Sequence, residues 1–198
     1  RDGKAINGSI DVAIKADKFA PTIKNDVTGD VTLKNTKKND GLLSFGDGET
    51  INIGGSFVAE TNGDFEYGST LLAGKDINIK SRNVYRREGT NGYFSSPGKI
   101  TFNVNAGNKI GTADNPVMIA NSAEKTSGLT IYGETHIKGV NDGVLTLGDV
   151  LTDNDVSISS EGSIVQADDK VISVKKITIA AAKEIILDNK NNIIENLV

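Results

Sequence analysis

The side chains best suited to binding chemistry gather in residues 81–97. This segment holds three of the chain's four arginines and two of its four tyrosines. Arginine and tyrosine supply hydrogen bonds and contact area at interfaces, and loops on a rigid scaffold often carry binding residues. We therefore predict that 81–97 is an inserted surface loop that binds a ligand through Arg82, Tyr85, Arg86, Arg87, Tyr93 and Phe94. The alternative is a plain corner loop whose aromatic rings cover the core.

A second candidate is the aromatic pair in Phe65-Glu66-Tyr67. If these two rings lie below the 81–97 segment, they could stack with Tyr93 and form a platform for a sugar ring. An ordinary edge strand with two aromatic residues is the alternative for this segment.

Carboxylates cluster at Asp149, Asp153 and Asp155. Pairs of carboxylates can perform general acid and base catalysis on polysaccharides, which makes an enzyme an alternative class. A lyase of that kind also needs a basic residue nearby, and the arginines lie far away in the sequence. His136 is the only histidine and is expected on a strand surface; with no cysteine it cannot complete a zinc site. We therefore predict no enzyme, no catalytic residues, no metal site and no cofactor.

The composition bounds the partners and the location. The net charge of −4 and the isoelectric point near 5.1 argue against nucleic acid, which requires a concentrated positive field. No apolar run reaches the roughly 18 residues of a membrane-spanning helix, so we expect no membrane insertion of this segment. The chain starts at Arg1 without an initiator methionine, and we interpret residues 1–198 as a single segment excised from a larger protein.

The elements that must position these residues are short strands. Residues 156–187 show the pattern best, with runs of two to four β-branched residues alternating with small polar ones, separated by Gly, Asp, Asn or Lys. Strands this short bury too little surface to be stable alone and must stack on copies of themselves. The sequence therefore predicts an all-β chain folded as a parallel β-helix, a β-solenoid with three-sided coils.

A period of about 20 residues supports the solenoid. Aligned strand starts fall at Ile10, Val31, Ile51, Ile77 and Ile100, and again at Val156 and Ile177. Such a period lies within the range of known solenoid repeats. Alternation then places Ile77/Ile79, Ile100/Phe102 and Ile177/Ile179 in the core, with Asn78, Thr101 and Thr178 facing outward.

Four short motifs resemble the repeats of filamentous-haemagglutinin-like exoproteins, the large adhesins and toxin carriers of bacterial two-partner secretion. They are GDVTL at 29–33, AGKDINI at 73–79, AGNKIGT at 106–112 leading into Asn115-Pro116-Val117, and AKEIILDN at 182–189. The resemblance implies a right-handed coil, export through an outer-membrane transporter and a place in the secreted or cell-surface fraction. The family's secretion domain carries Asn-Pro-Asn motifs, whereas this chain has Asp114-Asn115-Pro116-Val117, which indicates a downstream repeat region.

The resulting expectation is a section of a secreted, surface-associated bacterial adhesin. Its loops would bind a receptor or glycan on a host cell or a neighbouring cell. Two alternatives stay open. One is a β-helix polysaccharide lyase or hydrolase that uses the carboxylates between Asp149 and Asp155, and the other is a purely structural stalk of a large exotoxin.

Overall fold

The protein is a β-solenoid. The computed structural model describes residues 5–104, 109–120, 129–131, 134–140 and 142–198, so residues 106–108 of the third motif lie outside the described part. Every regular element in the described part is a β-strand, and the strand pairings there are all parallel. The strands stack in about eight turns of roughly 21 residues each. The predicted all-β parallel solenoid is therefore confirmed.

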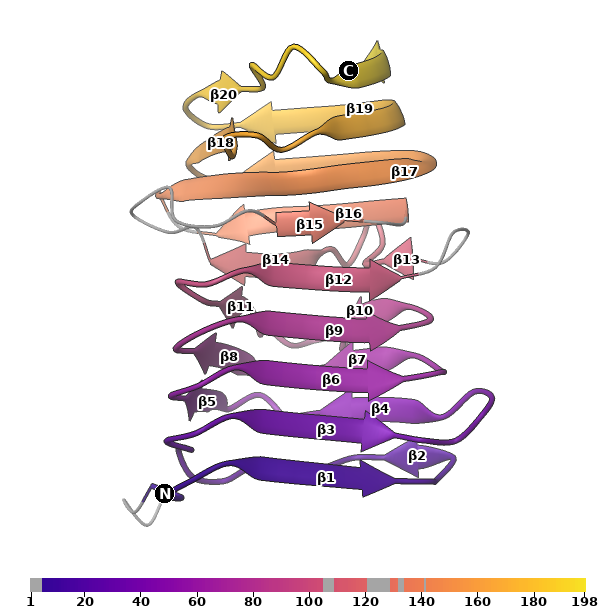
Figure 1. Ribbon diagram of the computed structural model, residues 1–198, viewed down its shortest axis with the longest axis vertical. Coiled ribbons are helices and arrows are strands. Elements are labelled where there is room, and N and C mark those ends of the chain that lie inside the picture. The colour runs from indigo at the N-terminus through magenta and orange to yellow at the C-terminus, as the bar shows by residue number, and fades with distance from the viewer. Residues whose placement is uncertain (1–4, 105–108, 121–128, 132–133, 141) are drawn as a thin grey trace.

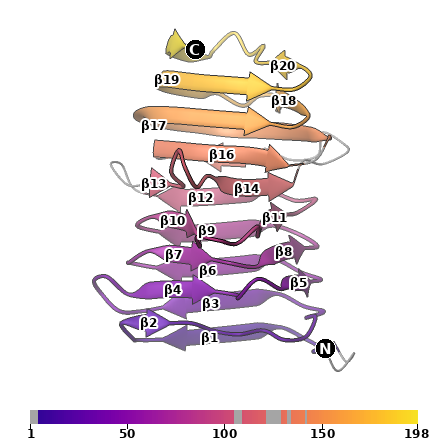
Figure 2. The same cartoon turned by 180° about the vertical axis from the view of Figure 1, so that it is seen from behind.

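In the N-terminal part of the rod the strands lie on three faces (Figure 1 and Figure 2). The first face contains β1 (Ile10–Ile14), β3 (Val31–Asn35), β6 (Phe57–Thr61), β9 (Ile77–Ser81), β12 (Ile100–Val104) and β15 (Leu129–Ile131). The second face contains β2 (Lys18–Phe19), β4 (Leu42–Phe45), β7 (Phe65–Tyr67), β10 (Val84–Arg86) and β13 (Lys109–Ile110). The third face contains β5 (Thr50–Ile53), β8 (Thr70–Ala73), β11 (Phe94–Ser95) and β14 (Val117–Ala120). The first turn contains β1 and β2, and each turn from β3 to β14 has three strands, one on each of the three faces.

In the C-terminal part, single long strands replace the separate strands of several faces. β16 (Glu134–Val140) pairs with both β13 and β14, so it covers the second and third faces. β17 (Val144–Ser160) and β19 (Ile172–Ala181) run from the first face round the corner onto the other two. β18 (Ser163–Gln166) and β20 (Ile185–Ile186) stack on the start of β17, and β21 (Ile193–Leu197) pairs with β19.

The coil is right-handed. In Figure 1 the strands of the first face lie toward the viewer and run left to right, while the chain climbs from the N-terminus to the C-terminus. Figure 2 shows the opposite side, where the strands of the second and third faces lead back to the start of the next turn. A path that crosses the near side rightward as it rises winds as a right-handed screw.

Alternation along each strand builds one continuous core. Ile77, Ile79 and Phe102 are at most 1% exposed, whereas Asn78 and Thr101 face outward, as predicted. Burial of each such aliphatic side chain contributes about 1.5–3 kcal/mol, and the stacked turns extend this gain along the rod. Six core rings form a chain of contacts through successive turns; they belong to Phe45, Phe57, Phe65, Tyr67, Phe94 and Phe102.

The predicted register is correct at most turns and wrong at one. Ile10 pairs with Val31, Ile77 with Ile100, and Val156 with Ile177. Ile51 is misassigned, because Val31 pairs with Phe57. Ile51 instead lies on the third face, where it pairs with Leu71. The longer polar turn after β3 lengthens this coil, and a search for the next Ile-x-Ile pattern therefore selects a strand on the wrong face.

We call the edge between the first and second faces the first corner. In the N-terminal part it consists of the turns that join β1 to β2, β3 to β4, β6 to β7 and β9 to β10. In the C-terminal part β17, β19 and β21 pass through the same corner as continuous strands, since their pairings with one another extend on both sides of it. The first corner therefore runs along the rod, as turns in the N-terminal part and as continuous strands in the C-terminal part.

Candidate binding groove

Residues 81–97, predicted as an inserted loop, are a regular turn of the rod. Strand β10 pairs with β7 below it, with Val84 opposite Phe65, and β11 pairs with β8, with Phe94 opposite Leu71. Only residues 87–93 lie between these two strands. The inserted-loop prediction is thus corrected: the sequence there is poor in Ile and Leu, but single buried positions such as Val84 and Phe94 are sufficient to keep each strand in the ladder.

The three arginines of this segment are bonded to the rod itself. Arg82 donates from Nε to Asp64 at 3.0 Å and also pairs with Asp40, and these bonds raise the pKa of its guanidinium. Arg87 donates to Gly46 O at 2.8 Å, to Ser44 Oγ at 2.7 Å and to Glu66 at 3.3 Å.

Arg86 donates to the carbonyl oxygens of Pro116, at 3.2 Å, and Thr90. The three guanidinium groups therefore tie neighbouring turns together, and they lie at two different corners instead of at one site.

The aromatic residues predicted as contacts lie mostly inside the rod. Phe94 is 0% exposed, and its ring centroid lies 4.3 Å from that of Tyr67. Tyr67 is equally buried, accepts a hydrogen bond from the Met118 N–H at 3.0 Å, and has a pKa raised by burial. Tyr85 and Tyr93 are half-buried. The sugar-platform hypothesis is wrong because Phe65 and Tyr67 point into the core, where no ligand can stack on them.

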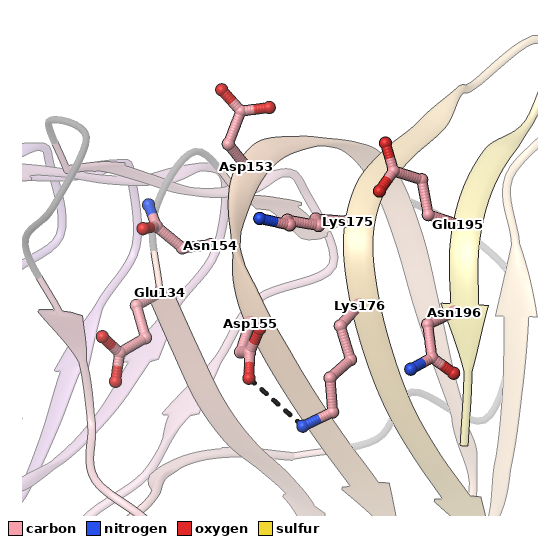
Figure 3. A pocket seen from close by; sticks show the side chains of 8 residues that line it. All are labelled: Glu134, Asp153, Asn154, Asp155, Lys175, Lys176, Glu195 and Asn196. Carbon is pink, nitrogen blue, oxygen red and sulfur yellow. Dashed lines mark hydrogen bonds and ion pairs between the residues drawn. The ribbon is translucent and has the colours of Figure 1, made fainter.

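A hollow lies elsewhere, on the C-terminal part of the first corner (Figure 3). It is an open groove of about 640 Å³, and we call it the corner groove. Its eight lining side chains come from four strands, β16, β17, β19 and β21. They are Glu134, Asp153, Asn154, Asp155, Lys175, Lys176, Glu195 and Asn196.

Local strand geometry explains why so many polar side chains face the same way. A strand normally alternates in and out, but the register between β17 and β19 shifts between Thr152 and Asp155. Residues 153–155 therefore turn outward together between the inward-facing Val150 and Val156. On β19, Lys175 and Lys176 both face outward between the buried Val174 and Ile177.

The charges of the corner groove are only partly neutralised. Asp155 and Lys176 form an ion pair at 3.2 Å, and Glu134 lies 3.3 Å from Lys109. In contrast, Asp153, Lys175 and Glu195 make no hydrogen bond or ion pair through their side chains with other parts of the chain that the structure describes. Figure 3 shows Lys175 extending from β19 toward β17. Charged groups of both signs are thus available to an external ligand.

A second hollow of about 310 Å³ adjoins the first and shares Asp155 and Lys176 with it. Its floor includes His136, Ser157 and Thr178, which are stacked in register on three successive turns. His136 lies on strand β16, as expected, with its Nε2 at 3.7 Å from Glu134. The Asp155–Lys176 ion pair forms the wall between the two hollows.

The structure divides the predicted carboxylate cluster and supplies it with basic neighbours. Asp153 and Asp155 line the corner groove, whereas Asp149 bonds to the backbone N–H of Val171 at 3.1 Å and to Lys170 at 3.4 Å. No arginine lines the groove, but stacking places the basic side chains of Lys175 and Lys176 beside Asp153 and Asp155. Among the described residues, no group of three or more His, Cys, Asp or Glu side chains is arranged to hold a metal ion.

Sequence reasoning missed this groove, although a signal exists. Two or three consecutive polar residues recur at 153–155, 175–176 and 195–196, where alternation would place an apolar residue. Once the period is known, these interruptions align on adjacent turns and mark one corner.

Comparisons with known proteins identify no relative: no protein-family model, no curated protein and no solved structure matches this chain. In the part of the chain that the structure describes, no helix is long and apolar enough to cross a membrane.

Proposed function

We propose that this chain is a binding segment of a secreted, surface-associated bacterial exoprotein, an adhesin that contacts a host or neighbouring cell through the corner groove. The single observation that carries the proposal is the set Asp153, Lys175 and Glu195, which have no bonded partner in the described part of the chain and lie on stacked strands of one rod. Exposed charges without partners contribute little to folding, and they are free to bond to another molecule. The resemblance to filamentous-haemagglutinin-like repeats supports the cell-surface location and export through an outer-membrane transporter.

Cell binding by a groove variant tests this proposal. The groove variant carries Asp153→Ala, Lys175→Ala and Glu195→Ala together. Its matched control variant carries Asp11→Ala, Glu88→Ala and Lys99→Ala, which remove the same charges at exposed positions that line neither hollow. We expect labelled wild-type protein and the control variant to bind cells, and the groove variant to lose most of that binding while keeping its β circular dichroism.

Two results would count against the proposal. Equal binding by the groove and control variants would show that cells are contacted outside the groove. If the wild-type protein binds to no cell tested, the remaining hypothesis is a purely structural stalk.

A second candidate function is carbohydrate cleavage. The observation that favours it is the presence of Asp153, Asp155, Lys175 and Lys176 in one open groove, since carboxylates and amines are the groups that transfer protons during polysaccharide cleavage. The test is incubation with acidic polysaccharides such as polygalacturonate, followed by detection of new reducing ends. The enzyme hypothesis requires cleavage by the wild-type protein and loss of cleavage in Asp153→Asn and Asp155→Asn. If the wild-type protein cleaves none of the polysaccharides, the enzyme hypothesis is wrong.

A further inference from the structure

The corner groove is elongated along the rod axis. Its lining residues lie on four successive turns, with Glu134 on β16, Asp153, Asn154 and Asp155 on β17, Lys175 and Lys176 on β19, and Glu195 and Asn196 on β21. Adjacent strands are about 4.8 Å apart, so the first and last of these strands are separated by roughly 14 Å. The spacing of about 4.8 Å between adjacent strands is close to the advance of one sugar unit in an extended oligosaccharide. A ligand that follows the groove would meet polar side chains of a new strand at each unit.

The charge of the corner groove selects against charged polymers. Four carboxylates and two ammonium groups line it, which gives a local charge of −2 on a chain whose net charge is −4. A polyanion would be repelled by this excess of carboxylates. A cationic polymer would meet Lys175 and Lys176 in the centre of the groove, between the carboxylates of β17 and β21.

A hydroxyl group can bond to every one of the groove side chains that have no partner among the described residues, whereas a group of one charge can bond only to some of them. Asp153 and Glu195 can only accept hydrogen bonds, Lys175 can only donate, and Asn196 can do both. A sugar hydroxyl donates one hydrogen bond and accepts others, so it can satisfy each of these side chains in turn.

The lining also distinguishes a sugar from a peptide. All eight lining side chains are polar or charged. Peptide-binding grooves gain most of their affinity from apolar or aromatic anchors buried in pockets, and this groove offers none. Bonding by hydroxyls alone gives weak binding at one groove, which suits a protein that meets many copies of its ligand on a cell surface.

We infer that the corner groove binds an uncharged oligosaccharide that lies along the rod axis, with Asp153, Lys175, Glu195 and Asn196 as its hydrogen-bonding residues. This inference rests on the proposed binding function and names the class of ligand that the same groove takes. The Asp155–Lys176 ion pair would remain formed beside the ligand and fix the positions of both side chains.

Calorimetric titration of the whole chain tests the ligand class. The neutral probes are cellopentaose, maltopentaose, mannopentaose and penta-N-acetylchitopentaose; the charged probes are a polygalacturonate oligomer and a lysine-rich peptide. We expect at least one neutral probe to bind, the groove variant to bind it about tenfold more weakly or worse, and the control variant to bind it like the wild-type protein. Binding should change little between low and high salt, because the ligand carries no charge.

Three results would overturn the inference. They are binding of none of the neutral probes, preferential binding of a charged probe, and equal binding by the groove and control variants.

Inhibition of cell binding separates the inference from the proposed function. If cells bind through the groove and no neutral probe competes, the ligand class is wrong and the adhesin function stands. If a neutral probe binds in solution but no cell binds, the ligand class stands and the cell-surface function fails.

Discussion

The two halves of the first corner differ in how far their polar side chains are bonded to one another. In the N-terminal half Lys37 bonds to Asp17, and Arg82 bonds to Asp64 and Asp40. The C-terminal half keeps the Asp155–Lys176 ion pair, but Asp153, Lys175 and Glu195 have no such partner among the described residues. The difference follows from the backbone. The N-terminal corners are turns that interrupt the strand ladder, so side chains must connect successive coils.

In the C-terminal half the strands themselves pass through the corner. Asp155 pairs with Lys176, and Lys176 pairs with Asn196, so backbone hydrogen bonds already join the turns there. Side chains at these positions are no longer needed to hold the coils together. Where continuous strands pass through a corner, its side chains need not join the turns and can bond to another molecule.

The core differs between the halves as well. All six rings of the aromatic chain lie between Phe45 and Phe102. From Ile110 onward the buried apolar residues of the described chain are Ile, Leu and Val alone. Large rings in the N-terminal half contribute more buried area per residue, which compensates for its interrupted ladder.

The largest expected effect is truncation in the aromatic chain. Phe94 is fully buried and contacts Tyr67 and Phe102, with a centroid distance of 5.8 Å to the latter. We expect Phe94→Ala to lower the free energy of unfolding by about 3–5 kcal/mol, since it leaves a cavity that the stacked turns cannot close. Urea unfolding followed by circular dichroism measures this loss.

The neighbouring Tyr93 provides the control, because it is only half-buried. Tyr93→Ala should cost about 1 kcal/mol or less. Equal losses in the two variants would mean that the aromatic chain does not stabilise the N-terminal half.

An intermediate effect is expected from the arginine that joins three turns. Arg87 donates to Gly46 O, Ser44 Oγ and Glu66, and its side chain is 28% exposed. Arg87→Ala should lower the free energy of unfolding by about 2 kcal/mol, because several charge-assisted hydrogen bonds are lost together. The same urea titration measures it.

Lys175→Ala is the matched change in the other half. Since Lys175 has no bonded partner among the described residues, its removal should shift stability by less than about 0.5 kcal/mol. A large loss from Lys175→Ala would show that the groove side chains stabilise the rod, and it would break the comparison.

The smallest effect is a dependence on pH. A hydrogen bond from Lys80, at 3.1 Å, and the charge of Lys34 hold the pKa of Glu60 below its ordinary value of 4.5, although partial burial opposes them. Because the pKa is lower in the folded state than in the unfolded state, the stabilisation is present above about pH 4.5 and disappears as the pH falls through the folded-state pKa. The side chain of Glu60 is 39% exposed, so the loss should stay below about 1 kcal/mol.

Unfolding titrations of the wild-type protein and of Glu60→Gln across this pH range measure the effect. The variant should lose less stability on acidification than the wild-type protein. Glu195→Gln removes an exposed carboxylate that has no ion-pair partner within the described ranges, and it serves as the control. Identical acid profiles for the wild-type protein and Glu60→Gln would contradict the role of the Lys34–Glu60–Lys80 ladder.

Most of the fold could be predicted because alternation and period are local properties of the sequence. The pairing of Ile77 with Ile100 and of Val156 with Ile177 follows from one repeated pattern. The pairing of Val31 with Phe57 could not be predicted from this pattern. The longer turn after β3 changes the spacing, and Phe57-Val58-Ala59 is a weaker strand pattern.

The predicted binding segment and the proposed corner groove lie in different places for a physical reason. Arginine and tyrosine in 81–97 have the right chemistry for an interface, but Arg87 reaches Ser44 and Gly46, roughly two turns away in the chain. The residues of the corner groove meet only because four turns are stacked in one register. Residue type alone does not reveal whether a polar side chain already has a partner.

The stacking of the strands also determines how the rod responds to force. Strands lie across the long axis in Figure 1, so the hydrogen bonds that join successive turns point along it. Tension applied between the two ends therefore pulls these bonds apart one turn at a time, beginning at a terminal turn. A turn such as the one from Ile10 to Val31 spans 21 residues and releases about 70 Å of extended chain. Under load the rod would lengthen in nearly equal steps. A groove away from the unwinding end would keep its shape while the extended chain at that end became longer.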